Sequence, residues 1–373
     1  MKMVINALSA RLGGGQTYLK NLLDNLPEQS DLDILVYVPV SLRLPEDLRI
    51  RRGTTRWPTE NPLLRTVWEV FHLPRILAHE KAQALFCPGG VVVTRVPAGC
   101  KTVTMFRNMI PFDRHALSRM PFGLQGIRNS LLKRVMLRSM ARADLTIFIS
   151  NYARNIIEGL IRVVNPVTIP HGIGAAFRTS GKALKRPGWL PMGEYILYVS
   201  RFDVYKHQLE VATAYCGLPS ELRNQYRLLL IGEVTDDQKR HITSLAHQNG
   251  AEQQLIVVGP VPYAEIPAAY HHATANLFAS SCENCPNILL EALGAGRPVL
   301  SSDVMPMPEF GADAVEYFSP FDPVSIRDAM RRVLEDESQR RRLGELAAGR
   351  SAKFDWSKTS RTTWQHILGL IAR

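Results

Sequence analysis

The sequence predicts two doubly wound α/β domains in series, each built around a mainly parallel sheet. Two observations lead to this prediction: short β-rich runs alternate with helical patterns, and the alternation starts again after a polar stretch at 181–194. Strands that alternate with helices are typical of βαβ units, whose strands run parallel. The length of 373 residues also fits about two domains of ordinary size.

The first half of the chain carries the predicted strands of one domain. They are the runs KMVINAL, DILVYVP, ALFCPGGVVV, KTVTMF, ADLTIFIS and NPVTIP. Helical patterns lie between them at TYLKNLLDNL and at the basic segment GIRNSLLKRVMLRSMAR. The stretch GKALKRPGWLPMGE, which is rich in Gly, Pro and Lys, then predicts a linker.

The second half repeats the pattern. Its predicted strands are YILYVSR, RLLLIGE, QLIVVGP, ANLFAS and PVLSSD, and its predicted helices are QLEVATAYC, DDQKRHITSLAHQ, IPAAYHHA and a helix from Pro286 through NILLEALGAG. Ligands bind beyond the carboxyl ends of the strands in such sheets, and two such domains that face each other form a cleft. We therefore expect a small-molecule site in a cleft between the domains.

The composition is that of a globular protein. Hydrophobic residues make up 46% of the chain and charged residues 21%. No apolar run approaches the ~18 to 20 residues of a membrane-spanning helix. The N-terminal run MKMVINAL meets Arg11 too early for a signal peptide. Five scattered cysteines suit a reducing cytosol, so the sequence predicts a cytoplasmic protein without a disulfide framework.

All of the net charge of +11 lies in the first half of the chain. Residues 1–171 hold 23 Lys and Arg against 12 Asp and Glu, whereas residues 172–373 hold 22 of each. This asymmetry predicts an anionic partner for the first half, which is a nucleic acid, an acidic membrane surface or a phosphorylated substrate.

The segment SSCENCPNILLEALGAG places two glutamates around the start of an apolar helix, directly after the predicted strand ANLFAS. Glu283 precedes the helix, Pro286 suits its first turn, and Asn287 and Glu291 lie four residues apart on one face. Carboxylates and helix-start N–H groups suit the hydroxyls of a sugar, which both donate and accept hydrogen bonds. Taken singly, Glu283 also fits a helix-end charge and Glu291 a solvated position.

Arg201 and Lys206 lie where the strand YILYVSR ends and the next helix begins. A forked guanidinium, an ammonium and a helix N-terminus together suit a diphosphate. The spacing alone is also common among ordinary surface charges. The segment with Glu283 and Glu291 follows in the same half of the chain, and the two motifs together are a more specific signal than either motif alone.

The pairing of Arg201 and Lys206 with Glu283 and Glu291 resembles the family-4 retaining glycosyltransferases of GT-B architecture, in which two Rossmann-like domains face each other across a cleft. LSARLGGGQTYLKNLL is similar to their N-terminal glycine loop, and ISNYARNIIEGL with VTIPHGIGAAF to the end of their first domain. FDWSKTSRTTWQHIL is similar to a final helix that crosses back onto that domain. The implied parts are a basic acceptor-side domain at 1–180, a nucleotide-sugar-binding domain at 181–350 and the crossing helix at 351–373.

The resemblance covers nearly the whole chain and also implies roles for single residues. Arg201 and Lys206 would hold the donor diphosphate and stabilise the charge that develops on it as a leaving group. Glu283 would bind hydroxyls of the donor sugar, and Glu291 the ribose of the nucleotide. The further implied donor contacts are the main chain at Asn284, Cys285, Pro286 and Asn287, the glycine loop Gly13, Gly14 and Gly15, and Gly232 and Gly259 beside the base. A tight turn is the alternative reading of the glycine loop.

The implied function is retaining, metal-independent transfer of a sugar from a GDP- or UDP-sugar, of the mannose type, to a saccharide or lipid-linked acceptor in bacterial lipopolysaccharide, O-antigen or capsule biosynthesis. No cofactor is implied, because the nucleotide sugar is a substrate. The alternative is a GT-B nucleotide-sugar epimerase, which needs no acceptor, or a glycan phosphorylase, which carries pyridoxal. A nucleic-acid-binding protein is a third class, but the segment IRNSLLKRVMLRSMAR lacks the aromatic residues that such proteins place among their basic ones.

One departure from the family concerns Arg107 and Asn108 in TMFRNMIPF, where the family often carries His-Asp. In the family that histidine faces the donor sugar. A guanidinium is no general base, and a forked cation suits a carboxylate or a modified C6. Arg107 and Asn108 are therefore expected to contact the donor sugar or the acceptor.

The segment 119–142 mixes basic and apolar side chains. They are Arg119, Arg128, Lys133, Arg134, Arg138 and Arg142 among Phe122, Leu124, Ile127, Leu131, Leu132, Met136 and Leu137. A basic amphipathic segment binds an anionic membrane surface, whereas the alternative is a core helix with a solvated basic face. Together with the resemblance, this predicts a peripheral protein on the inner face of the cytoplasmic membrane.

The sequence predicts no metal site. Asp31 and Asp33 form an Asp-x-Asp, the metal signature of another glycosyltransferase fold, but they lie far from the motifs in the sequence. Cys282 and Cys285 form a single CxxC, whereas zinc needs four ligands, so we expect them to pack within the sugar loop. His171 is expected to form a hinge hydrogen bond and not to act in catalysis.

Overall fold

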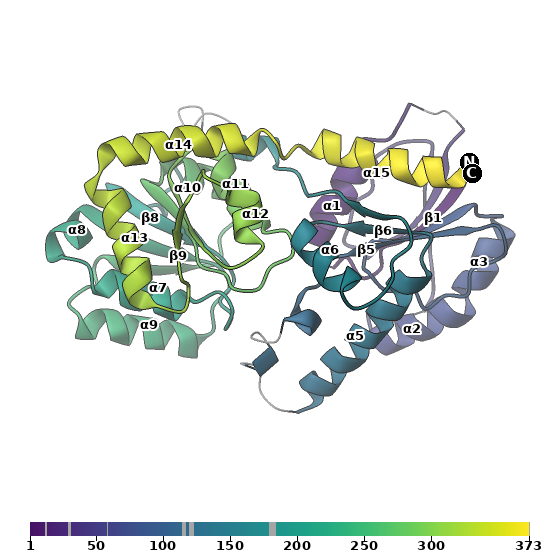
Figure 1. Cartoon of the computed structure of the whole chain (residues 1–373), viewed down its shortest axis with the longest axis horizontal. Coiled ribbons are helices and arrows are strands. Elements are labelled where there is room, and N and C mark those ends of the chain that lie inside the picture. The colour runs from purple at the N-terminus through teal and green to yellow at the C-terminus, as the bar shows by residue number, and fades with distance from the viewer. Residues whose placement is uncertain are drawn as a thin grey trace. The chain divides into compact units, whose positions relative to one another are not determined.

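Two parallel sheets organise the chain (Figure 1). The computed structural model describes residues 1–11, 13–28, 31–57, 59–113, 117–118, 123–178 and 184–372. The chain divides into unit 1, which comprises Met1–Phe112, Pro121–Gly172 and Trp356–Arg373, and unit 2, which comprises Asp113–Met120 and Ile173–Asp355. The domain boundary predicted between residues 180 and 181 lies outside the described residues.

The sheet of unit 1 has the order β3-β2-β1-β4-β5-β6-β7, and all of its strand pairs are parallel. The strands are β1 (Lys2–Asn6), β2 (Asp33–Tyr37), β3 (Ile50–Arg52), β4 (Ala84–Cys87), β5 (Lys101–Phe106), β6 (Leu145–Phe148) and β7 (Pro166–Thr168). The helices are α1 (Gly14–Asp24), α2 (Pro62–Phe71), α3 (Leu73–His79), η1 (Ile110–Phe112), α5 (Leu124–Arg142), α6 (Asn151–Glu158) and α15 (Trp356–Ile371). The strand order changes direction between β1 and β4.

The sheet of unit 2 has the order β10-β9-β8-β11-β12-β13, again entirely parallel. The strands are β8 (Glu194–Val199), β9 (Tyr226–Ile231), β10 (Leu255–Gly259), β11 (Ala275–Phe278), β12 (Val299–Ser302) and β13 (Glu316–Phe318). The helices are η2 (Ala175–Arg178), α7 (Gln208–Cys216), α8 (Ser220–Gln225), α9 (Asp236–Gln248), η4 (Tyr263–Glu265), α10 (Ile266–His272), α11 (Asn287–Gly294), α12 (Met307–Gly311), α13 (Pro323–Glu335) and α14 (Glu337–Ser351). The prediction of two doubly wound parallel-sheet domains is confirmed.

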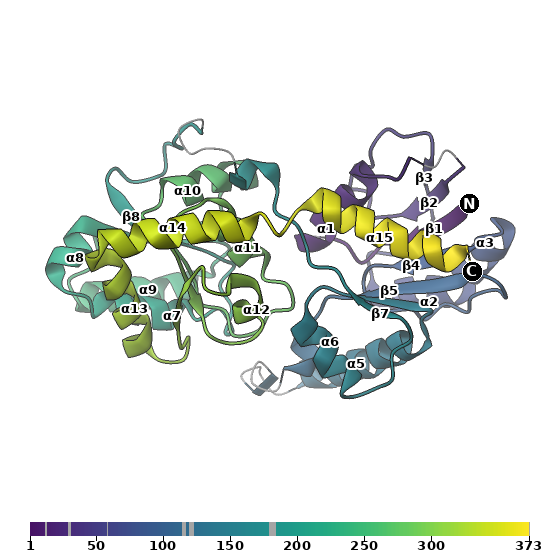
Figure 2. The same ribbon diagram turned by 45° about the horizontal axis from the view of Figure 1, so that its top comes forward.

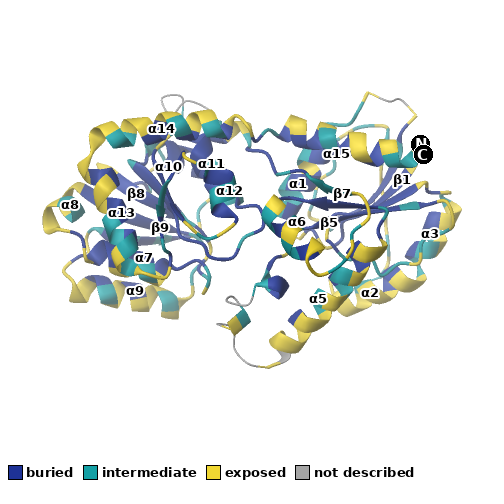
Figure 3. Ribbon diagram, viewed as in Figure 1, coloured by how far each residue is buried: buried dark blue, intermediate teal, exposed yellow. Residues whose placement is uncertain are grey.

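Burial explains why the central strands were readable in the sequence. Strands such as β4, β6 and β11 are buried along their whole length because helices cover the faces of a parallel sheet, so they appear in the sequence as short, mainly apolar runs (Figure 3). The edge strand β3 was not predicted, since its three residues IRR are half-buried or exposed. Helix α2 was also missed, although Asn61 caps it and Pro62 occupies its first turn.

The final helix, α15, packs within unit 1 although unit 2 precedes it in the sequence. Thr359 Oγ1 donates a hydrogen bond of 2.8 Å to the carbonyl of Pro170, and Trp364 Nε1 donates one of 3.0 Å to the carbonyl of Leu22. Figure 2 shows α15 beside α1. The chain therefore returns to its first sheet after completing the second.

The described part of the predicted linker packs on unit 2. Trp189 donates its indole N–H to the carboxylate of Glu265, and a ring nitrogen of His272 lies 3.2 Å from the carbonyl of Leu184. This segment is an ordered connection along the second unit and not a free tether.

Candidate functional site

The candidate site of unit 2 lies where the strand order of its sheet reverses. Strands β8 and β11 are neighbours, but the chain continues from β8 toward one edge of the sheet and from β11 toward the other. A crevice forms outside the carboxyl ends of the strands at such a point. The loops that follow the two strands meet there, because Ser281 N donates a hydrogen bond of 2.9 Å to the carbonyl of Tyr205.

Lys206 and Glu283, which the sequence analysis singled out separately, form an ion pair across these two loops. Their side chains are only 10% and 16% exposed. Ser280 Oγ donates to the same Glu283 oxygen at 2.7 Å, and the ammonium of Lys206 lies 5.1 Å from the ring centre of Phe278. A buried ion pair is stable only with such additional partners. An ammonium has three N–H donors, so Lys206 can bind Glu283 and a phosphate oxygen together.

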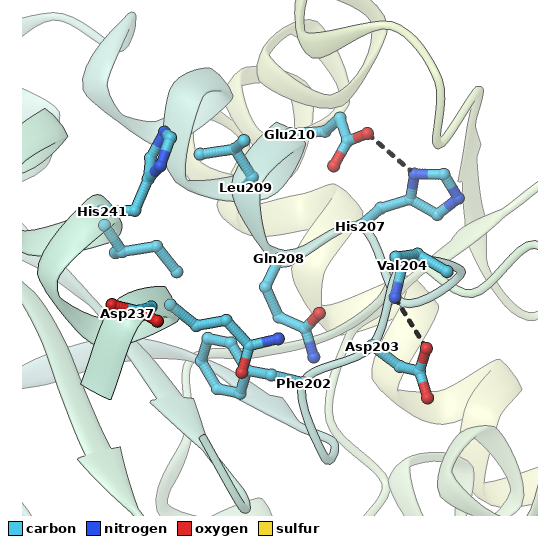
Figure 4. A pocket seen from close by; sticks show the side chains of 11 residues that line it. Phe202, Asp203, Val204, His207, Gln208, Leu209, Glu210, Asp237 and His241 are labelled. Atoms are coloured by element: carbon cyan, nitrogen blue, oxygen red, sulfur yellow. Dashed lines mark hydrogen bonds and ion pairs between the residues drawn. The ribbon is translucent and has the colours of Figure 1, made fainter. Parts of the chain in front are cut away.

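Arg201 is the exposed cation of the same loop. Its side chain is 64% exposed, and its Nη2 lies 3.1 Å from Asp203 Oδ2. This hydrogen bond raises the pKa of Arg201, which keeps its charge permanent. Asp203 also accepts from the main-chain N–H of Val204 at 2.8 Å (Figure 4). The loop thus presents the exposed guanidinium of Arg201, which is paired with Asp203. Asp203 in turn is bonded to the backbone of the same loop.

His207 is a residue of this site that the sequence analysis missed. Its ring is buried, with Nε2 2.8 Å from Ser281 Oγ. Nδ1 lies 3.1 Å from Glu210 Oε1 (Figure 4). The ring also meets Phe321 edge to face at 5.1 Å. Its backbone has a φ of 53°, which is uncommon for a residue other than glycine. His207 therefore ties the loop of Lys206 to the loop of Glu283, and its place directly after Lys206 was the available signal.

A cavity of about 560 Å³ opens beside this loop, between α7 and α9 (Figure 4). Its lining residues are Phe202, Asp203, Val204, His207, Gln208, Leu209, Glu210, Asp237, Gln238, His241 and Ile242. Lys206 and Glu283 are not among them, so this cavity is separate from the ion pair.

Gly232 directly follows β9 and Gly259 ends β10, and Gly232 N donates to the carbonyl of Gly259 at 3.0 Å. Both have a positive φ, of 145° and 90°. A Cβ at Gly232 would lie 2.0 Å from the carbonyl oxygen of Ser200, so only glycine fits. The structure thus brings both predicted glycines to the strand edge that carries Arg201.

Glu291 has a hydrogen-bonding partner that the sequence did not identify. Tyr263 donates its hydroxyl to Glu291 Oε1 at 2.8 Å. Burial raises the pKa of Glu291 to about 7, and the hydrogen bond from Tyr263 acts in the opposite direction. Burial therefore disfavours the ionised form of this carboxyl group, and a ligand that donates hydrogen bonds to it would favour that form.

The turn before α11 differs from the prediction in one respect. The helix begins at Asn287, and Pro286 is its N-cap residue instead of its first helical residue. The N–H of Asn287 donates to the carbonyl of Cys285 at 2.9 Å, and a proline has no N–H. The predicted set of main-chain donors therefore loses two of its four members. Asn284 and Cys285 are both buried in this turn.

The predicted residues of unit 1 also cluster. Gly13 has a φ of 63° and precedes α1, whose first residues are Gly14 and Gly15. A Cβ at Gly15 would lie 3.0 Å from Arg107 Nη1, so glycine lets this guanidinium lie against the first turn of α1. Asn108, by contrast, accepts a hydrogen bond of 3.2 Å from the N–H of Ile110 and thereby shapes the local turn.

The remaining candidates have structural roles. Asp31 pairs with the N-terminal ammonium at 3.2 Å and Asp33 with Arg51 at 2.9 Å. Cys282 and Cys285 are buried and unbridged, and burial with nearby Asp113 raises the pKa of the Cys282 thiol. His171 lies in a ring stack with Tyr18 and Trp356, at centroid distances of 5.6 and 5.3 Å. No group of three or more His, Cys, Asp or Glu in the described part of the chain could hold a metal ion.

Comparisons with known proteins match both halves of the chain to sequence families. Residues 12–177 match the family described as Glycosyltransferase Family 4, and residues 182–350 match the family described as Glycosyl transferases group 1. The chain is 32% identical over 168 residues to the serotype-specific mannosyltransferase WbdA of Escherichia coli. This match covers 45% of the chain but only 21% of WbdA, so the chain spans about a fifth of that relative.

Solved structures show the same fold over the full length. The sucrose-phosphate synthase of Thermosynechococcus elongatus aligns with a TM-score of 0.77 at 17% identity, covering 100% of this chain and 99% of its own. The Anabaena protein HepE, solved in complex with UDP, aligns with a TM-score of 0.75 at 16% identity, covering 99% and 100%. At these identities the likeness concerns the fold alone.

Proposed function

This chain belongs to the family-4 glycosyltransferases with the GT-B fold, and from that membership we propose that it transfers a sugar from a nucleotide-sugar donor, with retention of configuration, to a saccharide of a bacterial surface polysaccharide. The observation that carries the proposal is the meeting of Lys206, Glu283 and the loop of Arg201 at the reversal point of the second sheet. Two cations and a carboxylate suit a sugar diphosphate, which is anionic at one end and rich in hydroxyls at the other.

Arg201 and Lys206 bind the donor diphosphate in this proposal. The bond between the anomeric carbon and the phosphate oxygen breaks, and its electron pair stays on the diphosphate. The acceptor hydroxyl forms the new bond on the same face of the sugar and gives its proton to the departing phosphate oxygen. The two cations stabilise the charge that develops on that oxygen, so no side chain is needed as a base.

Glu283 and Glu291 bind the hydroxyls at the two ends of the donor. Glu283 lies beside Lys206 and accepts from hydroxyls of the transferred sugar. Glu291 lies four residues into α11 and accepts from the ribose, with Tyr263 as its companion donor. Gly232 and Gly259 bring the main chain close to the base because they carry no side chain.

The donor is assigned by similarity. WbdA is named as a mannosyltransferase, which supports a mannose-type sugar, and the UDP bound to HepE supports a nucleoside diphosphate. Arg107 contacts the sugar or the acceptor in this proposal, because its guanidinium lies against the glycine turn that starts α1. Asn108 serves this contact by holding the turn that follows Arg107.

The acceptor is proposed to be presented at an anionic membrane surface. On α5, Ile127, Leu131, Arg134 and Arg138 are exposed and follow one another at helical spacing on one face. Figure 3 shows this helix largely exposed. Lys133 instead lies over the ring of Phe112 at 5.2 Å. Residues 119–122 of the predicted segment lie outside the described residues. None of the described helices combines the length and apolar character needed to cross a membrane.

A second apolar surface of unit 1 supports the same proposal. Helix α2 exposes five large apolar side chains, which are Leu63, Leu64, Val67, Val70 and Phe71. The segment that follows β4 connects this helix to α5, since Thr94 Oγ1 donates to the carbonyl of Glu69 and Val92 N donates to Ser139 Oγ. Apolar side chains beside exposed arginines suit the interface of an anionic bilayer.

A donor screen tests the proposed function. Purified protein is incubated with GDP-mannose, UDP-glucose and related donors together with membrane-derived saccharide acceptors, and release of the nucleoside diphosphate is followed. Release that requires both a donor and an acceptor is expected, with the anomeric configuration kept in the product. Conversion of a nucleotide sugar without any acceptor would instead identify an epimerase.

A further inference from the structure

Unit 1 contains a cavity of about 570 Å³ that no part of the proposed donor site uses. It lies at the carboxyl ends of three neighbouring strands, because Leu8 follows β1, Val38 follows β2 and Gly53 follows β3. Its lining residues are Leu8, Arg11, Val38, Pro39, Val40, Leu42, Arg43, Arg52, Gly53, Thr54, Thr55, Trp57, Thr59 and Glu60. The position is the one at which parallel sheets bind ligands.

Three arginines line this cavity, and their charges are not neutralised by carboxylates. Arg52 donates to the carbonyls of Pro39 and Leu42, and Arg11 donates to the carbonyl of Thr59 at 3.3 Å. Arg43 has no hydrogen bond or ion pair within the described residues. A carbonyl accepts a hydrogen bond but carries no net charge, so the cavity keeps a surplus of positive charge. Among the described lining residues Glu60 is the only acid, and it is exposed.

The neighbouring arginines of the same sheet show that this surplus is local. Arg51 directly precedes Arg52 on β3 and projects to the opposite face of the sheet. Its guanidinium lies 2.9 Å from Asp33 and 2.7 Å from Glu80. Arg49 is likewise paired with Asp47 at 2.7 Å. The arginines around the cavity therefore lack carboxylate partners on a strand edge where the adjacent arginines have them.

Arg65, which lies outside the cavity lining, is affected by the charge of Arg11. Burial lowers the pKa of Arg65, its ion pair with Glu69 at 3.7 Å opposes this, and the charge of Arg11 lowers it again. Arg11 thus repels a second guanidinium. An anion bound between the cavity arginines would relieve this repulsion.

The rest of the lining suits a sugar ring. Trp57 is half-buried, packs against the core of unit 1 and meets the ring of His72 at 4.9 Å, so its indole is held in place. A fixed aromatic face gives an apolar platform at low conformational cost. Thr54, Thr55 and Thr59 add hydroxyls, which both donate and accept hydrogen bonds.

From this juxtaposition of three arginines without acidic partners, an aromatic wall and threonine hydroxyls, we infer that the cavity binds the acceptor and that the acceptor is an anionic saccharide, a sugar carrying a phosphate or a carboxylate. The inference rests on the proposed transferase function and adds the chemical class of the acceptor. Guanidinium groups bind both anions through paired N–H donors, so phosphate and carboxylate are the shared chemistry here.

Ligand binding to the full chain, measured by calorimetry without any donor, tests the inference. The probes are mannose 6-phosphate against mannose, glucuronate against glucose, and inorganic phosphate alone. At least one anionic sugar is expected to bind about tenfold or more tightly than its neutral counterpart, and that sugar identifies the anion. Equal affinity within both pairs would overturn the inference. Inorganic phosphate that binds as tightly as the sugar phosphate would overturn its saccharide part.

Matched variants locate the binding. Arg43→Gln removes an exposed guanidinium and is expected to weaken binding of the preferred anionic sugar by about tenfold, with the melting temperature unchanged. Arg162→Gln removes an exposed arginine of the same unit outside the cavity and should have little effect. Equal losses in the two variants would show a general charge effect and overturn the site. Unchanged binding in both Arg43→Gln and Arg11→Gln would overturn it as well.

The same samples separate this inference from the proposed function. Binding of GDP and UDP is titrated in parallel, and it tests the donor site of unit 2 independently of the sugar probes. Loss of nucleotide binding with intact anionic-sugar binding would count against the donor assignment alone. Normal nucleotide binding without any preference for anionic sugars would overturn the acceptor class alone.

Discussion

Lys206 and Glu283 form a largely buried ion pair, although 77 residues separate them in the sequence. Each residue was singled out from a different motif, one after β8 and one after β11. The pair shows that the two motifs belong to one site. The ammonium is held in place by the group proposed to bind the donor sugar, so the proposed function couples binding of the sugar to binding of the diphosphate.

Arg201 and Lys206 are predicted to affect catalysis and stability differently. Arg201→Gln should lower kcat by the equivalent of about 3 to 4 kcal/mol, the usual effect of removing a group that stabilises leaving-group charge, with little change in melting temperature because the side chain is exposed. Lys206→Met should slow transfer similarly but also destabilise the fold by roughly 3 to 5 kcal/mol, since it leaves Glu283 buried and unpaired.

The double variant Lys206→Met with Glu283→Gln provides the control. It should recover much of the stability lost in Lys206→Met while remaining inactive, because the uncompensated charge is gone and the cation is still missing. Thermal unfolding and steady-state kinetics measure the two effects. Near-normal turnover in both single cation variants would remove the diphosphate assignment.

Glu291 is predicted to make stability and nucleotide binding depend on pH near neutrality. Its folded pKa of about 7 lies above the ordinary value of 4.5 for a glutamate, so its stabilising contribution is complete below pH 4.5 and is lost as pH rises through 7. Glu291→Gln should therefore be about as stable as the wild type at pH 5. At pH 8 its unfolding free energy should be higher than that of the wild type by roughly 1 to 3 kcal/mol, which thermal unfolding at the two pH values measures.

Nucleotide binding by the wild-type protein should increase with pH, whereas its stability decreases. Ribose hydroxyls donate more strongly to an ionised carboxylate, so wild-type affinity for a nucleoside diphosphate should rise between pH 5.5 and 8. The Glu291→Gln affinity should be lower and nearly flat across this range. Tyr263→Phe, which removes only the companion hydroxyl, is the matched control. A wild-type affinity that does not change with pH would exclude Glu291 as the ribose ligand.

His207 is predicted to position the loops that carry Lys206 and Glu283. His207→Ala loses the contacts with Ser281 and Glu210 and is strained at a positive φ, so both kcat and stability should fall. His207→Asn tolerates that φ and offers polar atoms, and it should recover kcat more fully than His207→Gly, which relieves only the strain. Equal kcat values of the Asn and Gly variants would show that His207 acts only through its backbone conformation.

The exposed face of α5 is predicted to bind anionic vesicles. Each basic side chain near such a surface contributes roughly 1 kcal/mol, and salt screens the attraction. Changing Arg134, Arg138 and Arg142 together to Gln should release the protein from phosphatidylglycerol vesicles in a sedimentation assay. Lys133→Gln is the control, because Lys133 packs over Phe112 instead of joining the exposed face. Protein that stays in the supernatant with anionic vesicles at low salt would point to a soluble acceptor.

Metal independence is the last prediction. Two protein cations are proposed to take the role that a divalent metal plays in other transferases, so addition of EDTA should leave the rate of nucleotide release unchanged. Readdition of Mg²⁺ or Mn²⁺ serves as the control and should not raise the rate. Strict dependence on either ion would contradict the assignment of Arg201 and Lys206.

The sequence was most informative where burial was continuous. Strands such as β9 and β11 are mainly apolar because helices cover both faces of the sheet, so their type and their places along the chain could be predicted. Segments such as β3 and α2 were missed, because β3 is short and polar and α2 exposes apolar residues that a sequence pattern assigns to a core. Periodicity reports which residues share a face but not what covers that face.

The sequence by itself determined the two-sheet architecture and the residue types of the donor site, because alternating patterns and strand-end motifs are local properties of the chain. Only the tertiary structure decided how these residues are partnered. In the folded chain Lys206 pairs with Glu283, and Tyr263 donates a hydrogen bond to Glu291. His207 contacts the loop of Glu283 through Ser281, and three arginines line one cavity together with Trp57. These relationships depend on which strands become neighbours, and strand order is set by the packing of the whole sheet and not by any one segment.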